Sequence, residues 1–169
     1  ASEFCKDGKY ILEKKPLAAG ELADIYAGWA AKYGLVSLED PLAEDDITSY
    51  VKLRQQLRIP IMATEYSPGG LEGYAPWLML QATDYLRGDV AVKGGITTII
   101  KTAHLAEAFH MNYEVHHGGN SLNNVANLHV IMAIKNCEYF EVLLPDGAQK
   151  YGLLEDIVVD RSGLVHAPR

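Results

Sequence analysis

Apolar and polar positions along the chain repeat in a fixed order. Short apolar runs rich in β-branched residues end in a carboxylate or a histidine, and Gly-, Pro- or Asp-rich loops lead into segments with apolar residues three and four positions apart. The short runs are typical of buried strands and the longer segments of amphipathic helices. The pattern predicts helices at residues 17–32, 47–57, 75–82, 97–109 and 121–134, and strands at residues 35–39, 59–65, 85–92, 111–116 and 139–143.

Two of the predicted helices have recognisable ends. Gly34 follows the first helix as a C-terminal cap glycine would, and Asp46 precedes the second as an N-cap. Because strands and helices alternate with short loops, we expect an α/β fold with a parallel sheet and right-handed crossovers. Five strands fit either an open doubly wound sheet or part of a barrel. Residues 157–166 lie outside this series and predict a β-hairpin that turns at residues 160–163.

Composition narrows the class of protein. The chain has 169 residues, 49% of them hydrophobic, and a net charge of -7, which favours one domain with a buried core. An acidic chain is a poor general ligand for nucleic acid, and no apolar run is long enough to cross a bilayer. Cys5 and Cys137 are far apart and fit reduced thiols. We therefore expect a cytoplasmic protein without nucleic-acid or membrane partners.

Ionisable side chains fall at the ends of the predicted strands. Glu39, Glu65, His116 and Glu141 lie at or near the C-terminal ends of apolar runs, and Asp89 lies in the strand between. In parallel α/β folds this end of the strands is the functional face. A single strand-end carboxylate is usually a loop cap or a surface charge, but five such groups on consecutive strands indicate a site.

The residue types favour a magnesium site over a zinc site or a phosphate-binding loop. Glu39 and Glu65 lie on successive strands and can converge on one hard cation, and oxygen ligands suit Mg²⁺. Regular alternation would turn Asp40 to the opposite side of the strand from Glu39. The His116–His117 pair lacks a third zinc ligand at useful spacing. The Lys-Gly-Gly sequence at residues 93–95 lacks the spacing of a phosphate-binding loop.

Longer motifs carry a resemblance to a known family. Residues 1–46, with Ala-Ser-Glu-Phe, Lys-Asp-Gly-Lys-Tyr and Ser-Leu-Glu-Asp-Pro-Leu-Ala-Glu-Asp-Asp, resemble a true enolase. Residues 47–169 resemble the mandelate racemase branch of the enolase superfamily, especially its sugar-acid dehydratases. They contain Ile-Met-Ala-Thr-Glu-Tyr-Ser-Pro-Gly-Gly, Asp-Val-Ala-Val-Lys-Gly-Gly, Glu-Val-His-His-Gly-Gly-Asn and Tyr-Phe-Glu-Val-Leu-Leu-Pro.

The resemblance implies the C-terminal part of a (β/α) TIM-type barrel, with about five βα units and a C-terminal β-hairpin extension. We expect a single partial-barrel domain over residues 1–169. It would consist of an enolase-like segment at 1–46, dehydratase-like βα units at 47–152 and a hairpin segment at 153–169. Because two branches of the superfamily meet in one chain, we expect a fragment, an engineered chimera or a designed sequence.

The same resemblance implies a role for each candidate residue. Glu39 and Glu65 take the positions of two metal ligands, and His116 is the general base that Asp89 orients. Glu141 takes the place of the final-strand acid that hydrogen-bonds the substrate carboxylate. The implied activity is that of a magnesium-dependent hydro-lyase, which dehydrates an aldonate or aldarate by α-proton abstraction and enediolate stabilisation.

Three features of the family lie before Ala1 in its pattern: a third metal ligand, which is an aspartate, a lysine on an early strand, and the capping domain. A catalytically silent half-barrel or chimeric scaffold is therefore an alternative. Enolase activity (phosphopyruvate hydratase) is less favoured, because Asp89 lies on the strand where an enolase has a lysine base. The expected partners are a small-molecule carboxylate and either a second copy of the chain or a complementing barrel fragment.

Overall fold

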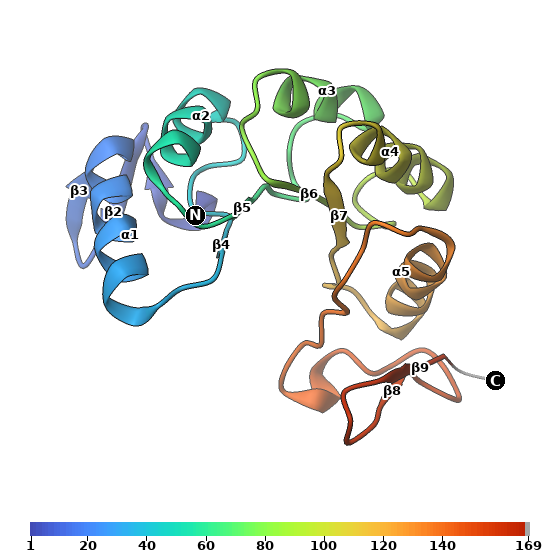
Figure 1. Cartoon of the computed structure of the whole chain (residues 1–169). Helices are drawn as coiled ribbons and strands as arrows, with labels where there is room; N and C mark the ends of the chain where they lie inside the picture. Colours follow the sequence, from blue (N-terminus) through green and yellow to red (C-terminus); the bar gives the residue numbers. More distant parts are fainter. Residues whose placement is uncertain (168–169) are drawn as a thin grey trace. The chain divides into compact units, whose positions relative to one another are not determined.

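The computed structural model describes residues 1–167, without the side chain of Asp146, and divides into two compact units (Figure 1). The first unit runs from Ala1 to Leu86 and the second begins at Arg87. Each unit buries its own set of large apolar side chains. Among the described residues the longest helix has 15 residues, and no helix combines the length and the apolar character that a bilayer crossing needs.

The first unit opens with a small antiparallel sheet that the sequence pattern did not predict. A 3₁₀ turn, η1 (Ser2–Phe4), leads into strands β1 (Cys5–Lys6), β2 (Lys9–Leu12) and β3 (Lys15–Leu17), which pair in that order. Tyr10 is the one buried residue of these strands. Strands this short, with a single buried side chain, have no alternating apolar pattern to detect.

The helices of the first unit confirm two predictions and correct a third. Helix α1 (Ala19–Tyr33) ends at Gly34, which has φ 62°, and α2 (Ile47–Gln56) begins after Asp46, whose side chain accepts the N–H of Ser49 at 3.2 Å. Both end signals were correct. Helix α3 (Leu71–Met79) begins four residues before the predicted start at residue 75. Gly73 and Pro76, both poor helix formers, lie in its first turns and hid its beginning.

The parallel strands are shorter than predicted. In the first unit, β4 (Leu38–Glu39) pairs with β5 (Ile61–Met62), and β5 pairs with the start of β6 (Tyr85–Gly88), both in parallel. The expectation that residues 35–39 form a buried strand was wrong, because Val36 is 82% exposed. Among the described residues, β4 lies at the edge of its sheet and pairs only with β5. The segment that contains β4 is therefore open to solvent on its other side.

In the second unit two helices pack around one strand. Strand β6 leads to α4 (Ile96–Ala108), and β7 (Asn112–Val115) leads to α5 (Ser121–Ala133). Helix α4 packs on β7 and on α5 (Figure 1). A short turn, η2 (Asp146–Ala148), precedes the antiparallel pair β8 (Val158–Val159) and β9 (Val165–His166), which confirms the predicted C-terminal hairpin.

The predicted last strand, at residues 139–143, is not a strand among the described residues. The described part of the chain contains four parallel strands followed by helices, β4 to β7, rather than about five. Side chains replace the missing ladder: the buried carboxylate of Glu114 accepts the N–H groups of Glu138 and Tyr139, each at 3.2 Å. An apolar run predicts an extended backbone, but a strand also needs a neighbour to pair with.

Candidate functional site

Three buried tyrosines fix the loop at residues 41–43, directly after β4. The hydroxyl of Tyr26 donates to the first carbonyl of this loop at 2.9 Å and that of Tyr50 to the second at 3.1 Å. The N–H of the third loop residue donates to the hydroxyl oxygen of Tyr10 at 3.0 Å. Burial raises the pKa of Tyr10 and Tyr26 to about 12 and raises that of Tyr50 further. All three phenols therefore stay protonated and hold the loop at neutral pH.

Three carboxylates of the first unit come together next to this loop. One oxygen each from Glu39, Asp40 and Glu65 lies within 4.8 Å of the others. The carboxylates of Glu39 and Glu65 therefore lie close together, as the sequence predicted. The expectation that Asp40 points to the opposite side was wrong: strand β4 ends at Glu39, and Asp40 has φ 45°, so the regular alternation stops there.

Glu65 lies in a tightly held loop after β5. Its side chain is buried, and the hydroxyl of Thr64 accepts the N–H of Tyr66 at 3.0 Å. Helix α3 packs closely on the same loop, since a Cβ at Gly73 would lie 2.0 Å from the carbonyl oxygen of Pro68. The three-carboxylate cluster borders a cavity of about 340 Å³, whose lining includes Ser2, Glu3, Asp40, Glu44, Thr64 and Glu65.

This donor set fits a hard divalent cation. Opposite oxygen ligands of Mg²⁺ are about 4.2 Å apart, because each metal–oxygen bond is about 2.1 Å long. Neighbouring oxygen ligands are closer, about 3.0 Å apart in an octahedron. The three carboxylate oxygens, which lie within 4.8 Å of one another, would therefore move closer together on binding. Glu39, Asp40 and Glu65 are the residues of this chain that could hold Mg²⁺.

In the second unit Asp89 and His116 form a hydrogen-bonded pair. The Nδ1 atom of His116 lies 2.9 Å from Oδ2 of Asp89. Burial alone would raise the pKa of Asp89, but hydrogen bonds from His116, Asn123 and the N–H of Ala91 outweigh it and hold the pKa below its usual value. An ionised carboxylate accepts only, so Nδ1 of His116 bears the hydrogen of this bond.

Two asparagines of α5 support this pair, and the sequence analysis missed both roles. Asn123 donates to both oxygens of Asp89, at 2.9 and 3.1 Å. Asn127 donates to the carbonyl of His116 at 2.9 Å and accepts the N–H of Val90 at 2.9 Å. One pattern in the sequence could have identified them: two asparagines four positions apart fall on the buried face of an apolar helix. Buried polar groups need specific hydrogen-bond partners.

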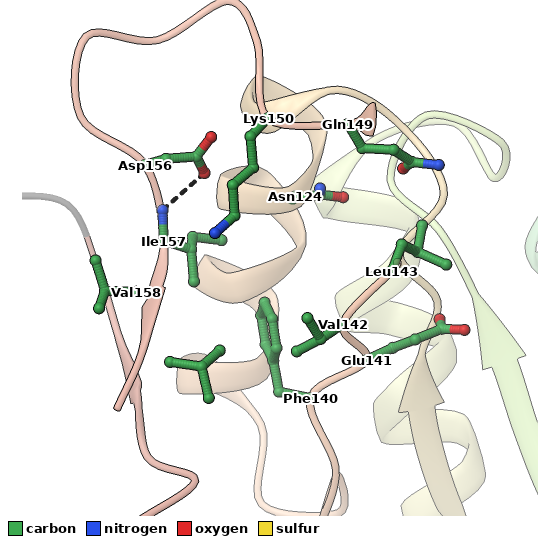
Figure 2. A pocket seen from close by; sticks show the side chains of 11 residues that line it. Asn124, Phe140, Glu141, Val142, Leu143, Gln149, Lys150, Asp156, Ile157 and Val158 are labelled. Carbon is green, nitrogen blue, oxygen red and sulfur yellow. Dashed lines mark hydrogen bonds between the residues drawn. The ribbon is translucent and has the colours of Figure 1, made fainter. Parts of the chain in front are cut away.

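Glu141 is held by two residues of the second unit. Its Oε2 accepts from Nη2 of Arg87 at 2.6 Å and from the backbone N–H of His117 at 2.9 Å. The side chain of Arg87 is only 4% exposed and that of Glu141 is 30% exposed, so this ion pair is shielded from solvent on the arginine side. The side chains of Glu141 and Phe140 point to opposite sides of the backbone (Figure 2). Arg87 was not identified from the sequence.

A cavity of about 240 Å³ borders this segment, and Glu141 is among the residues that line it (Figure 2). Its lining includes Asn124, Phe140, Val142, Gln149, Lys150 and Ile157. The structure thus brings Glu39 together with Glu65 in the first unit, and Asp89 with His116 in the second, where Glu141 is also found.

The alternating parallel strands and helices define part of a (β/α) barrel. Residues 18–169 match the model of the Enolase C-terminal domain-like family, and the chain belongs to this family. The enolase of Methanocaldococcus jannaschii is 32% identical over 106 residues, which are 63% of this chain and 25% of that enolase. The enolase of Elusimicrobium minutum is 44% identical over 57 residues, 34% of this chain and 14% of that enolase.

Solved structures of the superfamily share the fold. D-glucarate dehydratase from Agrobacterium tumefaciens, solved with magnesium, is 34% identical with a TM-score of 0.75, over 89% of this chain and 39% of that one. A protein described as a mandelate racemase/muconate lactonizing enzyme, from Pseudovibrio sp., is 28% identical with a TM-score of 0.82, over 89% of this chain and 40% of that one. The chain spans a quarter or less of these two enolases and about two-fifths of these two structures.

Proposed function

We propose that this chain carries the chemistry of a magnesium-dependent sugar-acid dehydratase, a hydro-lyase that acts on an aldonate or aldarate. The observation that carries the proposal is the Asp89–His116 pair, a buried carboxylate and a half-buried imidazole 2.9 Å apart. The 34% identity to a D-glucarate dehydratase over 89% of the chain supports the substrate class.

His116 is proposed as the general base. Asp89 fixes Nδ1 as the protonated nitrogen, so the lone pair of Nε2 can take the α-proton of a sugar acid. Asp89 keeps its negative charge because its pKa is low, and it stabilises the imidazolium that forms. The side chain of His116 is 16% exposed, so it is mostly buried yet still accessible. The net change in the substrate is the loss of one water, made from the α-hydrogen and the β-hydroxyl.

Glu39, Asp40 and Glu65 are proposed as the residues that hold Mg²⁺. A bound cation supplies positive charge that stabilises the negative charge developing on a carboxylate substrate. Asp40 adds a third carboxylate to the two ligands that the family resemblance implies. Glu141 is proposed to hydrogen-bond the substrate carboxylate, with Arg87 and His117 holding one of its oxygens.

Deuterium exchange tests the proposal. The chain is incubated with MgCl₂ in D₂O with D-glucarate and a panel of other aldarates and aldonates, and the α-proton signal is followed by NMR. We expect loss of the α-proton signal with at least one acid. His116→Asn abolishes the exchange and Asp89→Asn lowers it strongly, since an amide does not stabilise an imidazolium. If no acid exchanges in the parent chain, the proposed function is wrong.

His110→Asn is the matched control. His110 is exposed and has φ 55°, a conformation that asparagine adopts readily, so the same substitution is tolerated there. Exchange should stay at the parent level in this variant. Equal exchange in His116→Asn and His110→Asn would remove His116 from the mechanism.

The same experiment separates the two other candidates. An enolase-like activity would dehydrate 2-phosphoglycerate and leave sugar acids unchanged, and the enolase matches over part of the chain keep it in the panel. A silent scaffold would exchange neither substrate. For that case we propose self-association of one partial-barrel domain, which sedimentation at several concentrations would detect as a mass that rises with concentration.

A further inference from the structure

We infer that His117 is a positioning residue whose imidazole and backbone N–H together clamp Glu141 in place. The inference rests on the proposed function only for the importance of Glu141. The clamp itself is a statement about the contacts of His117, and it assigns different tasks to two adjacent histidines. His116 pairs with the carboxylate of Asp89, whereas His117 contacts the segment that carries Glu141.

His117 contacts this segment at three points. Its backbone N–H donates to Oε2 of Glu141 at 2.9 Å, and its ring Nδ1 lies 3.2 Å from the carbonyl oxygen of Glu141. A carbonyl oxygen only accepts, so Nδ1 of His117 bears the hydrogen. The ring also packs on Phe140, with 4.2 Å between the ring centroids. His117 is 1% exposed, so all three contacts are buried on its side.

The segment needs such a clamp because no strand ladder holds it. Residues 139–143 form no strand among the described residues. Glu114 anchors the start of the segment through the N–H of Tyr139 at 3.2 Å. Two residues further on, Arg87 and His117 anchor Glu141. Side chains thus provide the register that backbone pairing provides in a regular strand.

The clamp leaves part of Glu141 available. Arg87 and the N–H of His117 both bind Oε2. Among the described residues Oε1 has no protein hydrogen-bond partner, and the side chain of Glu141 is 30% exposed. One oxygen is therefore fixed by the protein while the other can meet a ligand.

The charge state of His117 suits this task. Burial lowers the pKa of His117 to about 4. The negative charges of Glu141 and Asp89 oppose this shift, whereas His116 and Arg87 lower the pKa further. The ring is therefore neutral at pH 7 and donates a hydrogen bond without adding positive charge. Arg87 remains the cation paired with Glu141, and the Asp89–His116 pair is not perturbed by a positive charge on His117.

Two substitutions of His117 separate the effect of its Nδ1–H hydrogen bond from the effect of ring packing on Phe140. His117→Phe keeps a flat ring against Phe140 and removes the donor to the carbonyl of Glu141. His117→Asn places an amide N–H close to the position of Nδ1 and removes the ring. If the hydrogen bond positions Glu141, His117→Asn should behave more like the parent than His117→Phe does.

The test uses two NMR measurements on the full chain. The first is a long-range ¹H–¹⁵N spectrum of the parent at pH 7, in which we expect His117 to be neutral with hydrogen on Nδ1. The second is amide exchange at position 117, corrected for the intrinsic rate of each residue type. Exchange should rise roughly fivefold in His117→Phe, the effect of about one hydrogen bond, and much less in His117→Asn.

The amide of Tyr139 is the internal control. It donates to Glu114 and should exchange at the parent rate in both variants, which separates local loosening from general unfolding. An imidazolium, or a hydrogen on Nε2 in the parent, would overturn the inference without any variant. Unchanged exchange at position 117 in a folded His117→Phe protein would overturn it as well.

Activity then shows whether the clamp matters for chemistry. If the parent exchanges the α-proton of a sugar acid, kcat should fall roughly fivefold in His117→Phe with KM little changed, and His117→Asn should restore most of it. Equal kcat in parent and His117→Phe would show that the clamp does not position the site. If the parent exchanges no substrate, the proposed function fails, while the two NMR measurements still decide the clamp.

Discussion

Gly118 lies so close to the imidazole of His116 that a Cβ at position 118 would be 2.3 Å from Cε1 and 3.0 Å from Nε2 of the ring. Such separations do not occur between non-bonded carbon atoms, so any side chain at position 118 displaces the ring. The neighbouring Gly119 has the same relation to Asn123, since its Cβ would lie 2.7 Å from Nδ2. The paired glycines leave room for His116 and for the asparagine that supports Asp89.

Gly118→Ala is therefore expected to push the imidazole of His116 away from Asp89. The ring is the mobile end of a side chain, so the fold should tolerate the change and the midpoint of unfolding should move little. The ¹⁵N shifts of His116 should change, and α-proton exchange should fall about a hundredfold, the range of a lost general base. Gly147→Ala is the control, because a Cβ there meets nothing within 4 Å. Parent-like spectra and exchange in Gly118→Ala would contradict the predicted displacement.

Asn123→Ala is expected to destabilise the chain in a pH-dependent way. The variant loses two hydrogen bonds to the ionised Asp89, which should lower the free energy of unfolding at pH 7 by about 2 kcal/mol. The folded-state pKa of Asp89 lies below its usual value of 3.8, so its contribution is complete above that pH and is lost as pH falls through the folded-state pKa. The stability curves of parent and variant should approach one another as the pH falls below 3.8 and should coincide below the folded-state pKa of Asp89.

Denaturant titrations between pH 7 and pH 2.5 measure this difference. Asn124→Ala is the matched control: it removes the neighbouring amide of the same helix, and no hydrogen bond joins Asn124 to Asp89 among the described contacts. A constant gap between parent and Asn123→Ala at every pH would contradict the assigned contact with ionised Asp89.

Local patterns predicted most of the helices. Helices α1, α4 and α5 lie within two residues of their predicted bounds, because helical spacing and cap residues are properties of adjacent positions. The strand ends placed Asp89 and His116 on consecutive predicted strands, and their side chains do form a hydrogen bond. Their catalytic roles stay predictions.

Features that depend on distant parts of the chain were not predictable in this way. Asp40 joins Glu39 because one backbone angle departs from the extended conformation, which alternation cannot foresee. Residues 139–143 have the composition of a strand, but pairing depends on the neighbouring backbone. The partner of Asn123 became apparent only once α5 was packed on its unit, since an amide in a helix does not specify what it contacts.

Glu65→Gln and Asp40→Asn are each expected to weaken Mg²⁺ binding. Each change removes one charged oxygen ligand of the cluster, so affinity should fall roughly tenfold or more, since loss of an outer-shell partner alone typically has that effect. Isothermal titration calorimetry measures the affinity. Glu44→Gln is the control, because Glu44 lines the same cavity but is not one of the three clustered carboxylates. An equal loss in Glu44→Gln would indicate general charge attraction rather than ligation.

His117 should make the fold sensitive to mild acid. Its pKa is about 4 in the folded chain, against a usual value of 6.5, mainly because burial disfavours the imidazolium. Between these two pH values the unfolded chain binds more protons than the folded one, so acid favours unfolding. The contribution of His117 to the free energy of unfolding is complete above pH 6.5 and is lost as pH falls towards 4, by up to about 3 kcal/mol.

Denaturant titrations of the parent from pH 7.5 to pH 4.5 should show this fall in stability, and His117→Asn should lack the part that His117 contributes. His129→Asn, at an exposed position of α5, should keep the parent slope. Parallel curves for parent and His117→Asn would mean that the imidazole is not buried in its neutral form.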